Sequence, residues 1–274
     1  MKNDSLGDRI KFYERRETDH RFMPFAPVIA RMDGRGFSRW TAGLERPFDK
    51  DLSQVMIEVT RRLVAETGAR IGYTQSDEIT LVLLVDEIER KMMFDGKAQK
   101  LCSVLASMTT SFFMLECMAR KDSELALRAL RGPQFDARVF QVPTRFEAAN
   151  AVLWREIDAR KNAISMGARS THEHRELQGK KGPEMIEMMA ARGQQFYAYP
   201  DFFKRGSFLQ ARTRSEALPD DVMTRMGVDG EHGERAVVTR RFIERIDMPV
   251  FSSVTNREAV IFEAAEPEVE TTEE

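Results

Sequence analysis

The order of hydrophobic periods in the first half of this chain constrains its fold more than any other feature. Strand-like and helix-like spacings alternate there. The predicted segments are a strand at 28–33, a helix from 52 to 64, the strands "RIGYT" and "EITLVLLV" with a hairpin tip near Ser76 and Asp77, a helix over 101–115, and a strand at 135–143. This β-α-β-β-α-β order predicts an α+β fold of the ferredoxin-like, split βαβ type, a mainly antiparallel sheet with helices on one face.

The second half of the chain is less regular, and it predicts a helical and irregular C-terminal extension. Thr144 with Glu147 predicts a capped helix that runs toward Ile164, with Trp154 as a core anchor. The last dozen residues carry six glutamates, which predicts a disordered acidic tail. The change in pattern divides the chain into segments 1–143, 144–262 and 263–274.

Composition excludes several classes of protein. A 274-residue chain with 42% hydrophobic and 31% charged residues is typical of soluble globular proteins. No signal-peptide pattern opens the chain, and the apolar run at 79–85 is far shorter than the ~20 residues of a membrane span, so we expect a cytoplasmic protein with no membrane partner. Cys102 and Cys117 lack metal-ligand spacing. A net charge of -2 means that any nucleic-acid contact must come from a local patch.

The stretch "RMDGRGFSRWT" at 31–41 ends the first strand with a carboxylate beside exposed backbone. Asp33 precedes two glycines, Gly34 and Gly36, and the predicted fold brings it near Asp77. Such a carboxylate pair can hold two Mg²⁺ ions roughly 4 Å apart, the arrangement of phosphoryl-transfer sites. The carbonyl of Gly34 would be a further ligand, and the amides of 34–38 would hold a triphosphate. Taken singly, an Asp-Gly pair usually marks a turn and "SDE" a polar hairpin tip.

Several motifs in order resemble one known family. "RMDGRGFSRWT" and "GYTQSDEITLVL" look like the two metal-binding motifs of the tRNA-His guanylyltransferase family. Further matches are "LGDRIKFYE", "RPFDKDL", "FDARV", "WREIDARKNAIS", "YPDFFKRGSF" and "SSVTNREAVIF". The resemblance implies enzymes that add nucleotides to the 5′ end of tRNA on a palm-like catalytic domain, with two Mg²⁺ ions and with ATP and GTP or another nucleoside triphosphate as substrates. Residues 1–143 would form that domain, and 144–262 would complete it and contact RNA.

The resemblance also assigns roles to individual residues. Asp33, Asp77 and Arg31 would be catalytic, the two aspartates with the Gly34 carbonyl being the metal ligands. Lys97 and Lys100 match basic residues that hold a second triphosphate. The full set expected to bind nucleotide is Asp33, Gly34, Arg35, Gly36, Phe37, Ser38, Arg46, Ser76, Asp77, Lys97, Lys100 and Asn162. Relatives are tetramers, so the resemblance also implies a homo-oligomer.

One motif indicates a branch of the family. Enzymes dedicated to tRNA-His carry "HINNLYN", whereas this chain reads "DARKNAIS", with Arg160 in the histidine position and Asn162 retained. This pattern is similar to the tRNA-His guanylyltransferase-like 3′-5′ polymerases, which repair truncated tRNAs against a template. The alternatives are a tRNA-His-specific enzyme that adds G at position -1, a palm-type nucleotidyl cyclase, and a noncatalytic RNA-binding relative. Retention of both Asp33 and Asp77 disfavours the last.

Overall fold

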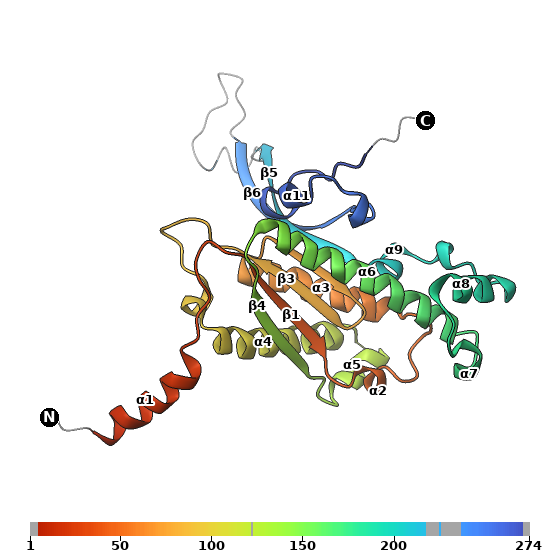
Figure 1. The fold of residues 1–274 in the computed structure, drawn as a ribbon, viewed down its shortest axis with the longest axis horizontal. Helices are drawn as coiled ribbons and strands as arrows, with labels where there is room; N and C mark the ends of the chain where they lie inside the picture. Colours follow the sequence, from red (N-terminus) through yellow and green to blue (C-terminus); the bar gives the residue numbers. More distant parts are fainter. Residues whose placement is uncertain (1–4, 122, 218–224, 226–236, 271–274) are drawn as a thin grey trace.

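The computed structural model describes residues 5–121, 123–217, 225 and 237–270, and it is built on one antiparallel sheet (Figure 1). The strand order is β4-β1-β3-β2-β5-β6, and every neighbouring pair is antiparallel. The strands are β1 (Val28–Gly34), β2 (Ile71–Gln75), β3 (Glu78–Leu83), β4 (Phe135–Gln141), β5 (Ser207–Ala217) and β6 (Val237–Ile246).

The first four strands confirm the predicted split βαβ unit. β3 lies between β1 and β2, which are joined through a helix, and β4 pairs on the outer side of β1. The hairpin tip falls at Ser76 and Asp77, as predicted, because Gln75 and Glu78 are the last paired residues of β2 and β3. The C-terminal portion then adds β5 and β6 to the same sheet.

Two groups of helices cover the sheet. The helices and helical turns are α1 (Leu6–Thr18), α2 (Phe37–Trp40), α3 (Lys50–Thr67), η1 (Met93–Gly96), α4 (Ala98–Ala119), α5 (Glu124–Ala129), α6 (Arg145–Arg169), α7 (His174–Leu177), α8 (Gly182–Ala191), η2 (Phe196–Ala198), α9 (Asp201–Lys204), η3 (Phe251–Ser253) and α11 (Arg257–Glu263). As predicted, α3 and α4 share one face. There, Ala30 and Met32 of β1 join a core with α3 and α4, whereas the alternate residue Ile29 joins the other core.

The opposite face is covered by α6 and α11 of the C-terminal extension (Figure 1). Thr144 caps α6 by accepting from the Glu147 N–H at 3.1 Å, as the sequence predicts. The prediction that Trp154 anchors the core was wrong: its side chain is 54% exposed, under Lys161. The buried positions Val152, Glu156 and Ala159 define the inner face. Trp154 follows Val152 by two residues, about 200° around the helix, and therefore faces outward.

α4 is long and apolar enough, by length and composition, to cross a membrane. In the fold it lies along the sheet, and it buries Leu105, Phe113 and Cys117 in the core shared with α3. Serines and threonines within α4 interrupt its apolar residues, so no long uninterrupted apolar run marks this helix in the sequence.

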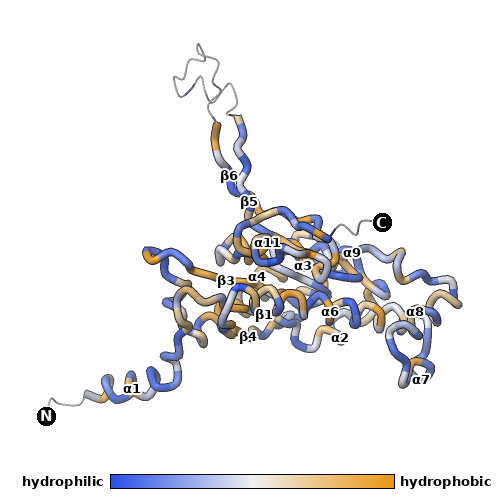
Figure 2. Tube along the Cα trace, turned by 45° about the horizontal axis from the view of Figure 1, so that its top comes forward, coloured by the Kyte–Doolittle hydropathy of each residue, from blue (hydrophilic) through white to orange (hydrophobic). Residues whose placement is uncertain are grey.

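Two segments extend from the central body (Figure 2), and the start of the acidic segment lies against it. α1 projects from it with no buried residue. β5 and β6 continue beyond the sheet as a two-stranded arm. The start of the acidic segment is not a free tail, because Val269 pairs with Val254 and the Thr255 N–H donates to the Glu268 carbonyl at 2.8 Å. Residues 271–274, also expected to be disordered, lie outside the described residues.

Gly72 offers a test of how tightly α3 is packed on β2. A Cβ added there would lie 2.6 Å from Val64 Cγ2 and 2.8 Å from Thr60 Cγ2. We therefore expect Gly72→Ala to lower the free energy of unfolding by about 1–3 kcal/mol, the usual cost of overpacking. Urea denaturation measures this. Gly182→Ala is the control, because its Cβ would meet only Ile164 Cδ1 at 3.7 Å. Equal stability of the two variants would contradict this packing.

Candidate active site

Three carboxylates line up across the end of the sheet. In the strand register Asp33 of β1 lies opposite Glu78 of β3 and opposite Asp136 of β4. Residues directly opposite in antiparallel strands project on the same face, so this row concentrates negative charge. Arg138 lies diagonally to the row, 3.8 Å from Asp33 Oδ2 and 3.4 Å from Asp136 Oδ1.

The hairpin tip brings a further carboxylate, Asp77, to the same place. The Gly34 N–H at the end of β1 donates to the Asp77 carbonyl at 3.1 Å, which ties the tip to the strand. Burial raises the pKa of Asp77 above its usual value, the Ser76 hydroxyl hydrogen bond opposes that rise, and the Asp33 carboxylate adds to it. Because Gly34 follows Asp33 directly and is bonded to Asp77, and because both aspartates line the same cavity, the two predicted aspartates lie at one end of the sheet.

Glu78 is the residue that links this acidic end to α6. Arg155 donates to both of its carboxylate oxygens, at 2.5 and 2.7 Å, and both side chains are more than four-fifths buried. Burial raises the pKa of Glu78, and Arg155 opposes the rise. Arg31 contributes a longer ion pair, with its Nε 3.9 Å from Glu78. Arg31 therefore borders the carboxylates from within the sheet.

The turn after β1 is held by aromatic packing. Phe37 is buried, with its ring 5.1 Å from that of Trp40 and 5.4 Å from that of Phe113. The ring of Phe37 also covers Gly34 so closely that a Cβ there would lie 2.3 Å from it. Gly36 adopts a left-handed conformation (φ 65°) that glycine adopts without strain. The sequence predicts that the amides of 34–38 hold a triphosphate, but the Gly34 and Arg35 amides donate instead to the Asp77 and Gln134 carbonyls, so these two do not fit that role.

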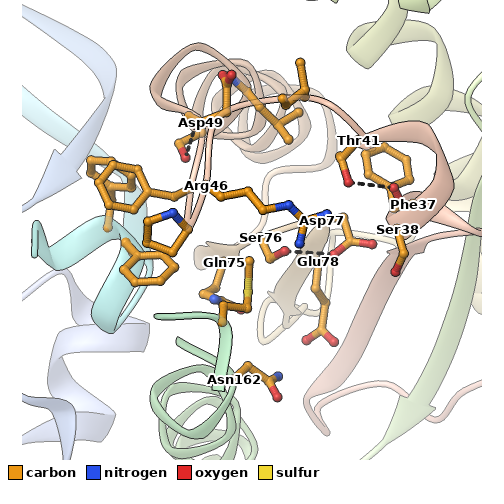
Figure 3. A pocket seen from close by; sticks show the side chains of 18 of the residues that line it. Phe37, Ser38, Thr41, Arg46, Asp49, Gln75, Ser76, Asp77, Glu78 and Asn162 are labelled. Atoms are coloured by element: carbon orange, nitrogen blue, oxygen red, sulfur yellow. Dashed lines mark hydrogen bonds between the residues drawn. The ribbon is translucent and has the colours of Figure 1, made fainter. Parts of the chain in front are cut away.

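These elements surround an open cavity of about 450 Å³. Its walls come from the ends of β1, β2 and β3, from α2, from the 44–53 loop and start of α3, and from α6 and α9. Figure 3 shows Arg46 reaching across it toward Ser76 and Asp77, with Asn162 entering from α6. One wall is aromatic, because the Phe48 ring lies 4.8 Å from that of Phe203 and 5.3 Å from that of Phe202. The cavity thus combines an acidic end, cationic side chains and an apolar wall.

The cavity gathers part of the residue set predicted from the sequence. Its lining includes Asp33, Phe37, Ser38, Arg46, Ser76, Asp77 and Asn162. Gly34 lies at its edge, hydrogen-bonded to Asp77. Arg35 and Gly36 line a different pocket, on the other side of α2.

Lys97 and Lys100 are not brought to this cavity. The Lys97 ammonium lies 3.0 Å from Asp19, whose pKa it lowers, and the Lys100 ammonium lies over the Phe94 ring. Both lysines lie near the start of α4, whereas Phe113, which touches Phe37, lies about four turns further along. At 1.5 Å per residue that separation is roughly 20 Å.

Sequence reasoning did not single out several lining residues. Glu78, Arg155, Arg169 and the aromatic residues Phe48, Phe202 and Phe203 line the cavity. Glu78 could have been found from the hairpin register, because it follows the tip directly and lies opposite Asp33. Arg155 and the phenylalanines lie in the family motifs "WREIDARKNAIS", "RPFDKDL" and "YPDFFKRGSF", which could have drawn attention to them, but no local pattern shows that these distant segments meet.

The acidic end has the donor chemistry of a magnesium site. Asp33 and Asp77 supply hard carboxylate oxygens beside an open cavity that leaves room for water. Across the described part of the chain, no three His, Cys, Asp or Glu side chains are arranged to enclose a metal. Two carboxylates beside an open cavity could hold a Mg²⁺ ion that keeps several of its waters.

The Glu78–Arg155 pair makes a testable contribution to stability. Arg155→Met leaves the Glu78 carboxylate buried without its partner, so we expect the free energy of unfolding to fall by about 3 kcal/mol. The double variant Arg155→Met/Glu78→Gln should recover much of that loss, because the neutral amide has a smaller desolvation cost. Chemical denaturation of wild type, both single variants and the double variant measures the coupling. Additive effects of the two substitutions would show that the pair does not act as a unit.

Comparisons with known proteins agree with this geometry. The family model for tRNAHis guanylyltransferase matches residues 7–143, the part of the chain that contains β1 to β4. The chain is 26% identical over 217 residues to the tRNA(His) guanylyltransferase of Schizosaccharomyces pombe, covering 74% of this chain and 79% of the relative.

Solved structures extend the similarity to the C-terminal portion. A bacterial tRNA(His) guanylyltransferase (Thg1)-like protein in complex with ATP is 30% identical, with a TM-score of 0.73, and the match covers 93% of this chain and 97% of that chain. A bacterial Thg1-like protein in complex with GTP is 28% identical, with a TM-score of 0.67, covering 91% and 94% respectively. With its split βαβ sheet and paired aspartates, the chain therefore belongs to the tRNAHis guanylyltransferase family of nucleotidyltransferases.

Proposed function

We propose that this protein is a template-dependent 3′-to-5′ nucleotidyltransferase that adds nucleotides to the 5′ end of truncated tRNA. The observation that carries the proposal is the convergence of Asp33 and Asp77 at one end of a cavity with cationic and aromatic walls. Similar bacterial proteins are described as complexes with ATP and with GTP, which supports these nucleotides as substrates here.

The proposed reaction has two phosphoryl transfers. An oxygen of the 5′-monophosphate of the RNA attacks the α-phosphorus of ATP, and pyrophosphate leaves. The 3′-hydroxyl of an incoming nucleoside triphosphate then attacks the adenylylated 5′ phosphorus, and AMP leaves. A 5′-triphosphorylated tRNA can skip the first step. Both transfers place negative charge on phosphate oxygens, which cationic groups fixed in advance stabilise.

The residues of the cavity suit these needs. Asp33 and Asp77, with the Gly34 carbonyl, would hold two Mg²⁺ ions, which supply charge neutralisation and orientation of phosphate oxygens. Arg46 reaches toward the same end and can bind phosphate. The rings of Phe48 and Phe202 provide an apolar surface against which a base can pack.

Arg31 is proposed to assist the adenylylation step. Its Nε is buried without a hydrogen-bond partner, and its ion pair with Glu78 is long, at 3.9 Å. A fixed cation beside the acidic end is suitably placed to act on a phosphate that enters there. For Lys97 and Lys100 the proposal of a second triphosphate site rests on the family resemblance alone.

The nucleotidyl cyclase alternative has less support. A cyclase of the palm type shares its site between two chains, whereas the described walls of this cavity come from both halves of one chain. For the tRNA-His-specific alternative, the deciding motif is "DARKNAIS". Asn162 lines the cavity, and Arg160 is exposed on the same helix.

We also propose that the protein works as a homo-oligomer, as the resemblance implies. α1 buries none of its residues and exposes Leu6, Ile10, Phe12 and Tyr13. Contact with a second copy would remove this apolar surface from water.

Substitution of either aspartate tests the site. We expect Asp33→Asn or Asp77→Asn to reduce nucleotide addition at least about 100-fold, because loss of a metal ligand removes several kcal/mol of transition-state stabilisation. The assay follows lengthening of a 5′-labelled tRNA that lacks one nucleotide, with Mg²⁺, ATP and GTP. Glu66→Gln, at an exposed carboxylate in the last turn of α3, is the control and should keep wild-type activity. Wild-type rates in either test variant would remove the aspartates from the mechanism.

The choice of nucleotide tests the branch. If base pairing with the opposite strand aligns the incoming 3′-hydroxyl, the enzyme should add whichever nucleotide pairs and should stop where pairing ends. The measurement uses truncated tRNAs that differ only in the templating base, each offered all four nucleotides. Incorporation of G against every template, or activity on tRNA-His alone, would favour the tRNA-His-specific function instead.

A further inference from the structure

Arg35 points to a second site next to the nucleotide cavity. The family resemblance implies that Arg35 binds nucleotide, but its side chain lines a separate open pocket of about 580 Å³. The lining of that pocket is Arg35, Gly36, Arg39, Trp40, Arg131, Gly132, Pro133 and Gln134. These residues come from two segments, the β1–α2 turn together with α2, and the loop before β4. The two segments are joined where the Arg35 N–H donates to the Gln134 carbonyl at 2.8 Å.

The side chains of this pocket offer hydrogen-bond donors almost exclusively. Arg35, Arg39 and Arg131 carry guanidinium groups, which have no acceptor. Trp40 is 91% buried, and its indole Nε1 donor has no acceptor in the structure. Gln134 is the one lining side chain with an acceptor oxygen, and Arg35 uses it at 3.1 Å.

The three positive charges are not neutralised within the described part of the chain. Arg35 contacts only the neutral Gln134 amide, and neither Arg39 nor Arg131 has a side-chain hydrogen bond or ion pair there. All three residues are exposed, and no carboxylate lines the pocket. Elsewhere on the surface, arginines such as Arg90 and Arg175 pair with a nearby glutamate. Three unpaired guanidinium groups around one pocket form a site for an anion.

The pocket and the nucleotide cavity lie on two sides of one helical turn. Phe37, Ser38 and Thr41 face the cavity, whereas Gly36, Arg39 and Trp40 face the arginine pocket. A helix with its side chains is about 10 Å across. Phosphates of one strand recur roughly every 3.4 Å along a nucleic-acid helix, so the pocket lies within a few nucleotides of the cavity.

We propose that Arg35, Arg39 and Arg131 bind a backbone phosphate of the RNA strand whose end enters the nucleotide cavity. The identity of that RNA rests on the proposed function. Phosphate oxygens of a free nucleoside triphosphate share the same chemistry. A triphosphate, however, carries Mg²⁺, and the carboxylates that could bind the metal line the cavity and not this pocket. A phosphodiester carries a single negative charge and can bind without a metal ion. A pocket lined by hydrogen-bond donors, with no carboxylate, therefore suits it.

The test compares RNA affinity with nucleotide affinity. The variants are Arg39→Ala/Arg131→Ala and the charge reversal Arg39→Glu/Arg131→Glu, and because both side chains are exposed the fold should persist, which circular dichroism checks. The control is Arg90→Ala/Arg175→Ala, which removes the same number of arginines from paired surface positions. Binding of a 5′-truncated tRNA is followed by fluorescence anisotropy at several salt concentrations. Binding of GTP with Mg²⁺ is measured on the same proteins.

We expect the alanine variant to bind the tRNA about tenfold more weakly or worse, and the reversal to bind it more weakly still. The dependence of log affinity on log salt should become shallower by about 1 for each phosphate that the variant no longer binds. GTP affinity and the control variant should be unchanged. Unchanged tRNA affinity, an equal loss in the control, or a loss of GTP affinity without loss of tRNA affinity would each overturn the proposal. Because binding is measured without chemistry, a wild-type protein that binds tRNA through these arginines but never lengthens it would contradict the proposed function alone.

Discussion

The antiparallel register between β1 and β3 is the constraint on which the rest of the structure depends. It sets Asp33 opposite Glu78 and brings the β2–β3 tip beside the end of β1, where the Gly34 N–H meets the Asp77 carbonyl. A slip of one residue would turn Asp33 toward the core of α3 and α4 and would move Met32 out of it. The hydrophobic alternation of β1 therefore fixes the position of a charged group.

Carboxylates gathered in this way repel one another, and the surrounding structure offsets the repulsion. Arg138 lies across the β1–β4 pair, Arg31 lies within β1, and Arg155 arrives from α6. Burial nevertheless raises the pKa of both Asp77 and Glu78. An acidic end that is incompletely neutralised by the protein, and open to a cavity, is suited to bind a divalent cation together with the phosphates that it carries.

The sequence predicted what local patterns can specify. The alternation of periods predicted the split βαβ unit, and the tip at Ser76 and Asp77 followed from the turn between two apolar runs. The prediction for Trp154 failed because α6 is covered on one side only, and its phase is set by small buried residues such as Ala159. The charge of residues 264–270 predicts disorder, but their backbone bonds with the Thr255–Asn256 turn hold them in place.

The same distinction applies to the site. Asp33 and Asp77 could be predicted because one lies at the end of β1 and the other at the β2–β3 tip. The hydrogen bonds that occupy the Gly34 and Arg35 amides could not, because the Arg35 partner, Gln134, is 99 positions away in the sequence. Arg155 reaches Glu78 across 77 positions of sequence, and Phe202 reaches Phe48 from the opposite half of the chain. Such contacts depend on how the C-terminal extension lies against the sheet, which no local pattern encodes. Likewise, the geometry of the single turn α2 places Arg35 and Arg39 at the neighbouring pocket and not at the cavity.

The most direct measurement is to locate the metal. Crystals of the protein grown with Mn²⁺ and a non-hydrolysable nucleoside triphosphate would show the ion by its anomalous scattering. We predict metal at the carboxylates of both Asp33 and Asp77, with the triphosphate beside the 34–38 turn. Metal and nucleotide bound together at another cavity, with the two aspartates uncoordinated, would contradict the proposed site.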